Sequence, residues 1–137
     1  GIPMQALRPN FEKRDGLVTV VAQDHRTGEV LMVAYTDLAG YIETLETSKA
    51  VYYSTSREKR WMKGEESGDV QEVASISVDC DGDALVYHIT QRGDGACHTK
   101  AKSCFYRRAD GTKKYNAPKA GEAEALTFID VKAYLPS

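Results

Sequence analysis

Residues 70–91 read VQEVASISVDCDGDALVYHITQ, and this stretch decides the fold. Apolar and polar residues alternate along 70–78, which is the period of a half-buried β-strand. The same alternation returns at 84–91, where three bulky apolar residues share one face. Between the two runs, Asp81-Gly82-Asp83 favours a turn. We therefore predict an antiparallel hairpin with these three residues at its turn.

An earlier hairpin and a helix are predicted on the N-terminal side of this stretch. Residues 17–23 and 29–35 are apolar, β-branched runs separated by a cluster of turn-forming residues. Thr36 or Asp37 can cap a following helix. Its apolar residues fall at helical spacing, and they are Leu38, Tyr41, Ile42 and Leu45. We expect this helix to lie across a sheet with that apolar face toward the core.

Further strands are expected at residues 50–54, 105–108 and 126–131. The segment 54–68 between the first of these and the central hairpin is polar, and we interpret it as a loop. Taken together, the pattern predicts an α+β fold in one domain, mostly antiparallel strands with one or two helices.

The net charge argues against a nucleic-acid or membrane-surface protein. With 18 basic and 20 acidic residues the formal charge is −2, so no overall basic field attracts polyanions. No run of about 18 apolar residues occurs, and residues 1–10 lack the apolar core of a signal peptide. We therefore expect a soluble, cytosolic protein.

Three aspartates crowd the turn of the central hairpin. Asp79, Asp81 and Asp83 lie within five residues, so their carboxylates repel one another. A divalent cation would remove that penalty, and grouped carboxylates suit a hard ion such as magnesium. The alternative is that acidic residues in an Asp-Gly turn serve only as local hydrogen-bond acceptors. That alternative explains one or two of the three aspartates.

All three cysteines lie in or just after the same hairpin. They are Cys80, Cys97 and Cys104, and no Cys-x-x-Cys spacing occurs among them. Each taken alone could be a small buried hydrophobic residue. Together, three thiolates leave one tetrahedral position of a zinc ion open for water, which is typical of a catalytic site. His98 follows Cys97 directly, and we interpret it as a proton-transfer group rather than a fourth ligand.

The polar segment 54–68 gathers four basic residues, hydroxyl groups and the only tryptophan. It could be a solvated loop that Trp61 anchors to the core. It could also be an anion pocket, because Arg and Lys bind phosphate and Trp offers a face on which a base can stack. Both interpretations can hold at once.

The combination of motifs resembles the phosphoribosyl-AMP cyclohydrolase family of histidine biosynthesis. The resemblance rests on Asp79-Cys80-Asp81-Gly82-Asp83, Ala96-Cys97-His98-Thr99, Ser103-Cys104-Phe105-Tyr106-Arg107, Trp61-Met62-Lys63-Gly64-Glu65 and Ser67-Gly68. It extends from about residue 16 to residue 108. We accordingly divide the chain into an N-terminal arm (1–15), a cyclohydrolase core (16–108) and a C-terminal extension (109–137).

The resemblance implies a hydrolase that adds water to C6 of the adenine ring of 1-(5-phosphoribosyl)-AMP and breaks the N1–C6 bond. It also implies a homodimer with active sites at the subunit interface and one zinc ion per subunit. The implied zinc ligands are Cys80 of one subunit with Cys97 and Cys104 of the other. The implied magnesium ligands are Asp79, Asp81 and Asp83.

In this interpretation His98 transfers a proton during the reaction. The residues expected to bind substrate are Arg57, Trp61, Lys63, Glu65 and Ser67, with Arg57 and Lys63 holding the two phosphates. The chain departs from the family pattern at three residues, Met62, Glu66 and Lys100. At the position of Lys100, relatives often carry a small residue after His-Thr.

Two alternatives are weighed against this interpretation. A zinc nucleobase deaminase attacks a ring carbon in a related way, but its His-x-Glu and Pro-Cys-x-x-Cys motifs are missing from the sequence. A nucleic-acid-binding module with structural zinc would have a basic face and four ligands around the metal. The net charge of −2 and the count of three cysteines argue against that module.

Overall fold

The computed structural model describes residues 5–136. The first four residues of the predicted arm 1–15 and the last residue of the predicted extension 109–137 lie outside that range. In chain order the elements are η1 (Phe11–Arg14), β1 (Val18–Asp24), β2 (Val30–Thr36), α1 (Leu38–Thr47), β3 (Val51–Ser54), β4 (Lys59–Met62), β5 (Gln71–Val78), β6 (Ala84–Gln91) and η2 (Val131–Tyr134).

Six strands form one sheet in the order β4-β3-β2-β1-β6-β5. Both predicted hairpins are confirmed, since β1 pairs with β2 and β5 with β6 in antiparallel register. The predicted strand at 50–54 is β3, and the α+β class with mostly antiparallel strands is confirmed. The exception is β1, which pairs in parallel with β6 at the centre of the sheet.

One loop prediction and two strand predictions were wrong. Residues 59–62 were assigned to a polar loop but form β4, which pairs with β3 although Lys59 and Arg60 are exposed. Residues 105–108 and 126–131 are not strands, and only an isolated bridge between Arg107 and Lys113 occurs there. The apolar content of these segments is strand-like, but a strand also requires a neighbouring backbone to pair with.

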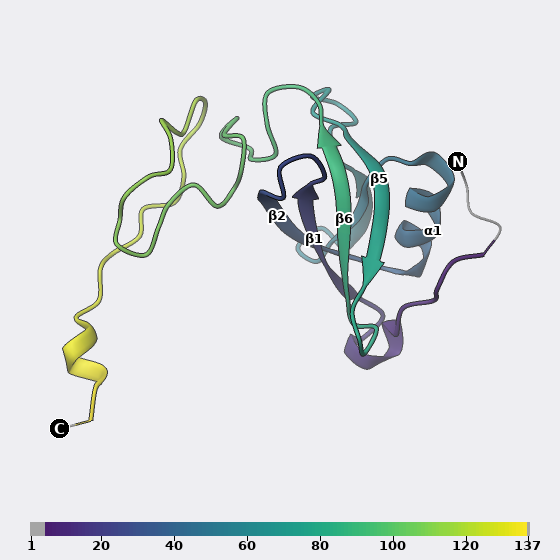
Figure 1. Cartoon of the computed structure of the whole chain (residues 1–137), viewed down its shortest axis with the longest axis horizontal. Helices are drawn as coiled ribbons and strands as arrows, with labels where there is room; N and C mark the ends of the chain where they lie inside the picture. Colours follow the sequence, from purple (N-terminus) through teal and green to yellow (C-terminus); the bar gives the residue numbers. More distant parts are fainter. Residues whose placement is uncertain (1–4, 137) are drawn as a thin grey trace.

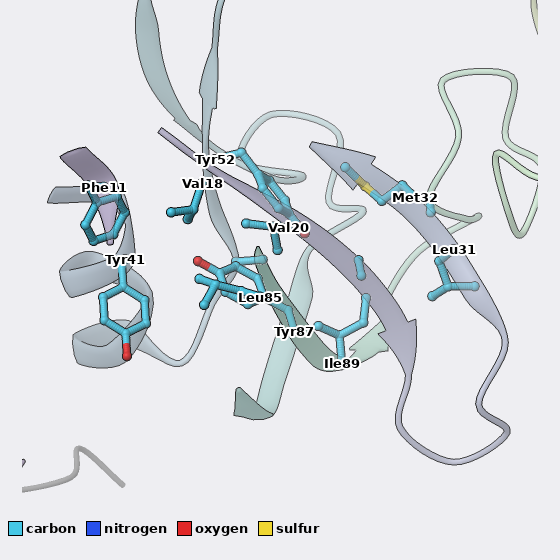
Figure 2. Close-up of a cluster of buried hydrophobic side chains, with 13 residues drawn as sticks. Phe11, Val18, Val20, Leu31, Met32, Tyr41, Tyr52, Leu85, Tyr87 and Ile89 are labelled. Carbon is cyan, nitrogen blue, oxygen red and sulfur yellow. The ribbon is translucent and has the colours of Figure 1, made fainter. Parts of the chain in front are cut away.

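The sheet curls back on itself. The Val73 N–H donates to the Ser48 carbonyl at 2.8 Å, and the Ala50 N–H donates to the Gln71 carbonyl at 3.0 Å, so the segment leading into β3 bonds to the start of β5. The curl encloses a buried core that Figure 2 shows in close-up. Its residues are Phe11, Val18, Val20, Ala22, Leu31, Met32, Tyr41, Ala50, Tyr52, Leu85, Tyr87, Ile89 and Ala96.

Helix α1 begins as predicted, because the Asp37 carboxylate accepts a hydrogen bond from the Gly40 N–H at 2.8 Å. The prediction of its buried face is correct for two of the four residues. Tyr41 is buried and Leu45 packs against the core, whereas Leu38 and Ile42 are 39% and 44% exposed. The helix therefore has an apolar strip that the described chain leaves open to solvent.

After β6 the chain leaves the sheet and forms a small second lobe, coloured green to yellow in Figure 1. Its buried residues are Cys97, Ala101, Tyr106 and Ala117. Beyond this lobe the chain extends away from the sheet (Figure 1). Most of its apolar side chains there are more than half exposed, namely Leu126, Phe128, Ile129, Val131, Tyr134 and Leu135.

A buried hydrogen bond gives a test of this core. The Tyr52 hydroxyl donates to Gln71 Oε1 at 2.5 Å, and both residues are completely buried. Tyr52→Phe leaves that oxygen without its donor, so we expect the free energy of unfolding to fall by about 1–3 kcal/mol in urea denaturation. The neighbouring Tyr53→Phe serves as the matched control, because Tyr53 is only partly buried, and should change it by less than about 0.5 kcal/mol. Equal effects would contradict the assigned role of the Tyr52 hydroxyl.

Candidate active site

The candidate ligands lie at opposite ends of β6. Cys80 is in the turn before this strand, whereas Cys97 and Cys104 follow its other end. Eight residues of extended chain separate the two ends, which is roughly 26 Å at about 3.3 Å per residue. Within residues 5–136, only the three aspartates bring metal-ligating atoms of at least three side chains to within 4.8 Å. One chain therefore does not gather all three cysteines around one ion.

Cys97 begins a tight turn that closes on itself. The Lys100 N–H donates to the Cys97 carbonyl at 2.9 Å, and the Cys97 N–H donates to the Ala101 carbonyl at 3.2 Å. Gly95 makes this closure possible, because a Cβ atom there would lie 2.3 Å from the Ala101 carbonyl oxygen. The Cys97 side chain therefore projects from a loop whose backbone is held by these two hydrogen bonds.

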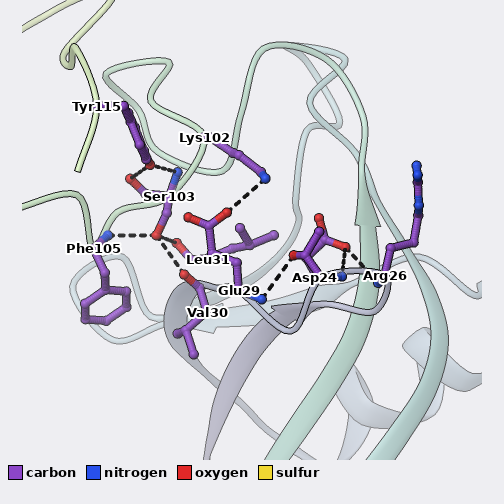
Figure 3. A network of polar contacts seen from close by, with 10 residues as sticks. Asp24, Arg26, Glu29, Val30, Leu31, Lys102, Ser103, Phe105 and Tyr115 are labelled. Atoms are coloured by element: carbon purple, nitrogen blue, oxygen red, sulfur yellow. Dashed lines mark hydrogen bonds and ion pairs between the residues drawn. The ribbon is translucent and has the colours of Figure 1, made fainter.

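Ser103, the residue before the second thiol, is bonded to the start of strand β2, as Figure 3 shows. Its hydroxyl donates to the Val30 carbonyl at 2.7 Å, and its backbone N–H donates to the Tyr115 hydroxyl at 2.6 Å. The Cys104 N–H then donates to the Leu31 carbonyl at 2.8 Å. Cys104 is therefore held by the sheet on one side and by the second lobe on the other.

The two thiols differ in acidity. Burial raises the pKa of Cys104 to about 12, and the neighbouring Cys97 adds to that increase. Burial also raises the pKa of Cys97, but hydrogen bonds from the Thr99 hydroxyl and backbone N–H outweigh it and lower the pKa on balance. The Thr99 hydroxyl lies 3.0 Å from the sulfur and is completely buried. Cys97 is thus the more readily ionised of the pair.

Among the predicted substrate-binding residues, the structure brings Lys63 to the thiols. Burial lowers the pKa of Lys63, while Cys104 and Asp69 oppose that change by attraction. Arg57 is exposed at the far end of the β3–β4 hairpin from Lys63. Ser67 is exposed in the loop after Lys63, and its hydroxyl accepts from the Asp69 N–H at 3.2 Å.

Trp61 and Glu65 share a shallow pocket of 220 Å³ on the β4 side of the sheet, with Glu43 and Arg60. The Trp61 ring packs against Tyr52 with 5.3 Å between ring centroids, as expected for an aromatic anchor of this segment. Trp61 thus packs against the core and also lines this pocket.

His98 is exposed beside the thiol turn. Its Nδ1 lies 4.0 Å from the Cys97 sulfur, so the ring is a neighbour of the predicted metal position. Exposure leaves it free to meet a substrate at that position.

The acidic turn carries compensating cations that the sequence analysis missed. Lys13 lies 2.7 Å from Asp81 and 3.2 Å from Asp83, and Arg14 lies 3.0 Å from Asp83. Hydrogen bonds from Arg14 and Lys13 lower the pKa of Asp83, whereas partial desolvation raises that of Asp79. Asp79 also accepts the N–H groups of Asp83 and Ala84, at 3.0 and 3.2 Å. Carboxylate repulsion alone therefore does not require a metal ion.

Sequence reasoning also missed Asp69, Thr99 and Ser103 as residues that hold the segments carrying Cys97 and Cys104. Thr99 and Ser103 stand next to candidate ligands in the chain, and that adjacency was an available signal. No sequence signal pointed to Asp69, because its partners Asp94 and Lys100 lie more than 20 residues away.

Comparison with known proteins gives consistent matches. Residues 32–106 match the family model described as phosphoribosyl-AMP cyclohydrolase. The chain is 58% identical over 104 residues to the phosphoribosyl-AMP cyclohydrolase of Methanothermobacter thermautotrophicus, covering 76% of this chain and 74% of that relative. It is 50% identical over 99 residues to that of Desulforapulum autotrophicum, covering 72% and 79%. It is also 54% identical over 99 residues to the histidine biosynthesis bifunctional protein HisIE of Aquifex aeolicus, covering 72% and 48%.

The Thr99 hydroxyl gives a test of the surroundings of the Cys97 thiol in metal-free protein. Thr99→Val removes the donor to the Cys97 sulfur at nearly constant volume, so the pKa of Cys97 should rise. The thiolate fraction below that pKa then falls, and alkylation of Cys97 at neutral pH should slow several-fold. Mass spectrometry of the peptide that carries Cys97 measures the rate. Thr99→Ser keeps the hydroxyl and should react at nearly the wild-type rate, whereas equal slowing of both variants would contradict the assignment.

Proposed function

This chain belongs to the phosphoribosyl-AMP cyclohydrolase family, and we propose how its residues open the adenine ring of 1-(5-phosphoribosyl)-AMP. The protein is an enzyme of histidine biosynthesis that hydrolyses the N1–C6 bond of that ring. The structural observation on which the proposed site depends is the pair of thiols, Cys97 and Cys104, beside the Lys63 ammonium group.

The thiol pair fits zinc by its donor chemistry. Cys97 has a lowered pKa, and Cys104 is close enough for the two thiols to influence each other's ionisation. Lys63 supplies a nearby positive charge that offsets part of the negative charge of two thiolates. When bound by these residues and a third cysteine, zinc activates water for attack at neutral pH.

The surrounding residues bind and orient the substrate in this proposal. Attack at C6 pushes charge toward N1, and His98 transfers the proton that ring opening requires. Lys63 and Arg57 hold the phosphates from two ends of the β3–β4 hairpin. Trp61 and Glu65 line the pocket in which part of the nucleotide is held, and Ser67 lies in the same loop. Such fixation of the ring over the thiol pair supplies the orientation that catalysis needs.

We assign magnesium to the acidic turn. Asp79, Asp81 and Asp83 each bring a carboxylate oxygen to within 4.8 Å of the others, and hard oxygen ligands suit this ion. Magnesium has to compete there with Lys13 and Arg14, which already contact two of the carboxylates. The ion therefore binds weakly unless substrate phosphate joins the site.

A homodimer with shared active sites explains where the third zinc ligand comes from. Since β6 holds Cys80 at one end and the thiol pair beyond the other, a site with three cysteines requires Cys80 from a second subunit. Apolar side chains exposed on β2 and α1 support such a subunit contact, among them Val33, Tyr35, Leu38 and Ile42. The same arrangement places the partner's acidic turn beside this chain's thiol pair.

We place the enzyme in the cytosol, where a reducing environment keeps the three ligand thiols free. No helix in the described part of the chain is long and apolar enough to cross a membrane. The deaminase and the structural-zinc module are not favoured, because the family match and the relatives name a cyclohydrolase.

Turnover of 1-(5-phosphoribosyl)-AMP by the purified chain tests the function and its metals together. Chelation should abolish ring opening, and zinc with magnesium should restore it. Cys97→Ala should lower kcat by about three orders of magnitude or more, because the activated water is lost. Circular dichroism checks that this variant is folded. A folded Cys97→Ala enzyme with more than a tenth of wild-type activity would contradict the proposed ligand.

Mixed dimers test the shared site. In a dimer of Cys80→Ala with Cys97→Ala, one of the two sites keeps all three cysteines, so about half of the wild-type activity should return. A dimer of Cys97→Ala with Cys104→Ala is the matched control, because each site lacks one ligand and no activity should return. Absence of recovery in isolated Cys80→Ala and Cys97→Ala heterodimers would contradict the arrangement.

A further inference from the structure

We propose that Asp69 and Lys100 form a positioning pair that holds the Cys97–Lys100 turn against the end of the sheet and the 63–69 loop. The inference rests on the proposed function in naming Cys97 a zinc ligand and Lys63 a substrate-binding residue. Neither Asp69 nor Lys100 contacts the reacting atoms in this proposal. Their role is to fix the position of Cys97 relative to Lys63.

Asp69 is a buried carboxylate that connects three segments of chain. Its side chain is 6% exposed and lies 2.5 Å from the Lys100 ammonium group. Its Oδ1 accepts the Asp94 N–H at 3.0 Å, and its backbone carbonyl accepts Gln91 Nε2 at 2.8 Å. The residue thus links the loop after β4, the end of β6 and the thiol turn.

The turn after β6 is built around this carboxylate. A Cβ atom at Gly93 would lie 2.0 Å from Asp69 Oδ1, so the backbone there passes directly against the Asp69 side chain. Gly93 has a φ of +73°, a conformation that favours glycine. Such close approach fixes where the chain leaves the sheet on its way to Cys97.

Lys100 adopts a backbone conformation that its residue type rarely takes, with a φ of +64°. Its N–H closes the turn on the Cys97 carbonyl, while its side chain reaches back to Asp69. A lysine held in the left-handed region needs an interaction that offsets the strain. The ion pair with a buried carboxylate supplies that interaction.

The outer side of the turn has a separate support. The Thr99 carbonyl accepts the N–H groups of Lys119 and Ala120, at 2.9 and 2.8 Å, so the second lobe holds that side. Asp69 holds the inner side and ties it to the sheet. The Asp69 carboxylate also favours the charged form of Lys63, which partly offsets the lowering of the Lys63 pKa by burial.

The test uses a variant that removes the pair without leaving a buried charge. In the Asp69→Asn, Lys100→Gly double variant no charge is unpaired, and glycine at residue 100 relieves the positive φ, so the fold should be retained. Lys100→Arg keeps the pair and serves as the rescue variant. Lys102→Met is the matched control, because it removes a more exposed lysine of the same loop, 2.9 Å from Glu29.

We expect hydrogen exchange of residues 97–101 in the metal-free double variant to be about tenfold faster than in wild type, with an unchanged rate in the core strands. With zinc supplied, kcat should fall about tenfold or more while KM changes less, because the thiol turn no longer holds its position. Lys100→Arg should stay within about threefold of wild type in both measurements, and Lys102→Met should resemble wild type.

Wild-type exchange and wild-type kcat in the folded double variant would overturn the proposal. Failure of the double variant to fold would also overturn it, because the pair would then be needed for the whole fold rather than for one turn. The exchange measurement needs no substrate. If wild-type enzyme did not turn over 1-(5-phosphoribosyl)-AMP, the proposed function would fail while the exchange rates still decided whether the pair positions the turn.

Discussion

Strand β6 imposes the constraint on which the rest of the structure depends. It pairs with β1 on one side and β5 on the other, so it is rigid, and it separates the acidic turn that carries Cys80 from the loop that carries Cys97 and Cys104. A side chain cannot bridge a strand of that length. The proposed zinc site therefore depends on a second chain for Cys80, and the exposed apolar residues on β2 and α1 are the surface that we propose for contact with that chain.

The thiol end of the molecule is organised by polar contacts instead of by a large apolar core. Ser103 fastens the Cys104 loop to β2, Thr99 donates to the Cys97 sulfur, and Asp69 anchors the turn from beneath. The Thr99 contact is buried and the other two are partly buried, so a hydrogen bond lost on one side leaves its partner poorly satisfied. Such a network resists small displacements, and this is the property that a metal and substrate site requires.

The acidic turn shows how a charge cluster can have two explanations at once. Lys13 and Arg14 neutralise it within one chain, and Asp79 is occupied by the backbone N–H groups of its own turn. These contacts hold the carboxylates close together, so the same geometry that satisfies them also brings one oxygen of each carboxylate to within 4.8 Å of the others. The pairing with η1 ties the chain's N-terminal region to one end of the site.

Local features were determined by the sequence alone. Alternation and turn residues predicted both hairpins and β3, and Asp37 with the helical spacing predicted α1, because period and capping depend on neighbours in the chain. The cysteine and aspartate motifs likewise indicated the family from the sequence. Tertiary structure alone decided the parallel β1–β6 pairing, the exposure of Ile42, the cations at the acidic turn and the Asp69 contacts. These four features depend on which residues, distant in sequence, come into contact when the sheet curls. No local sequence pattern encodes those long-range contacts.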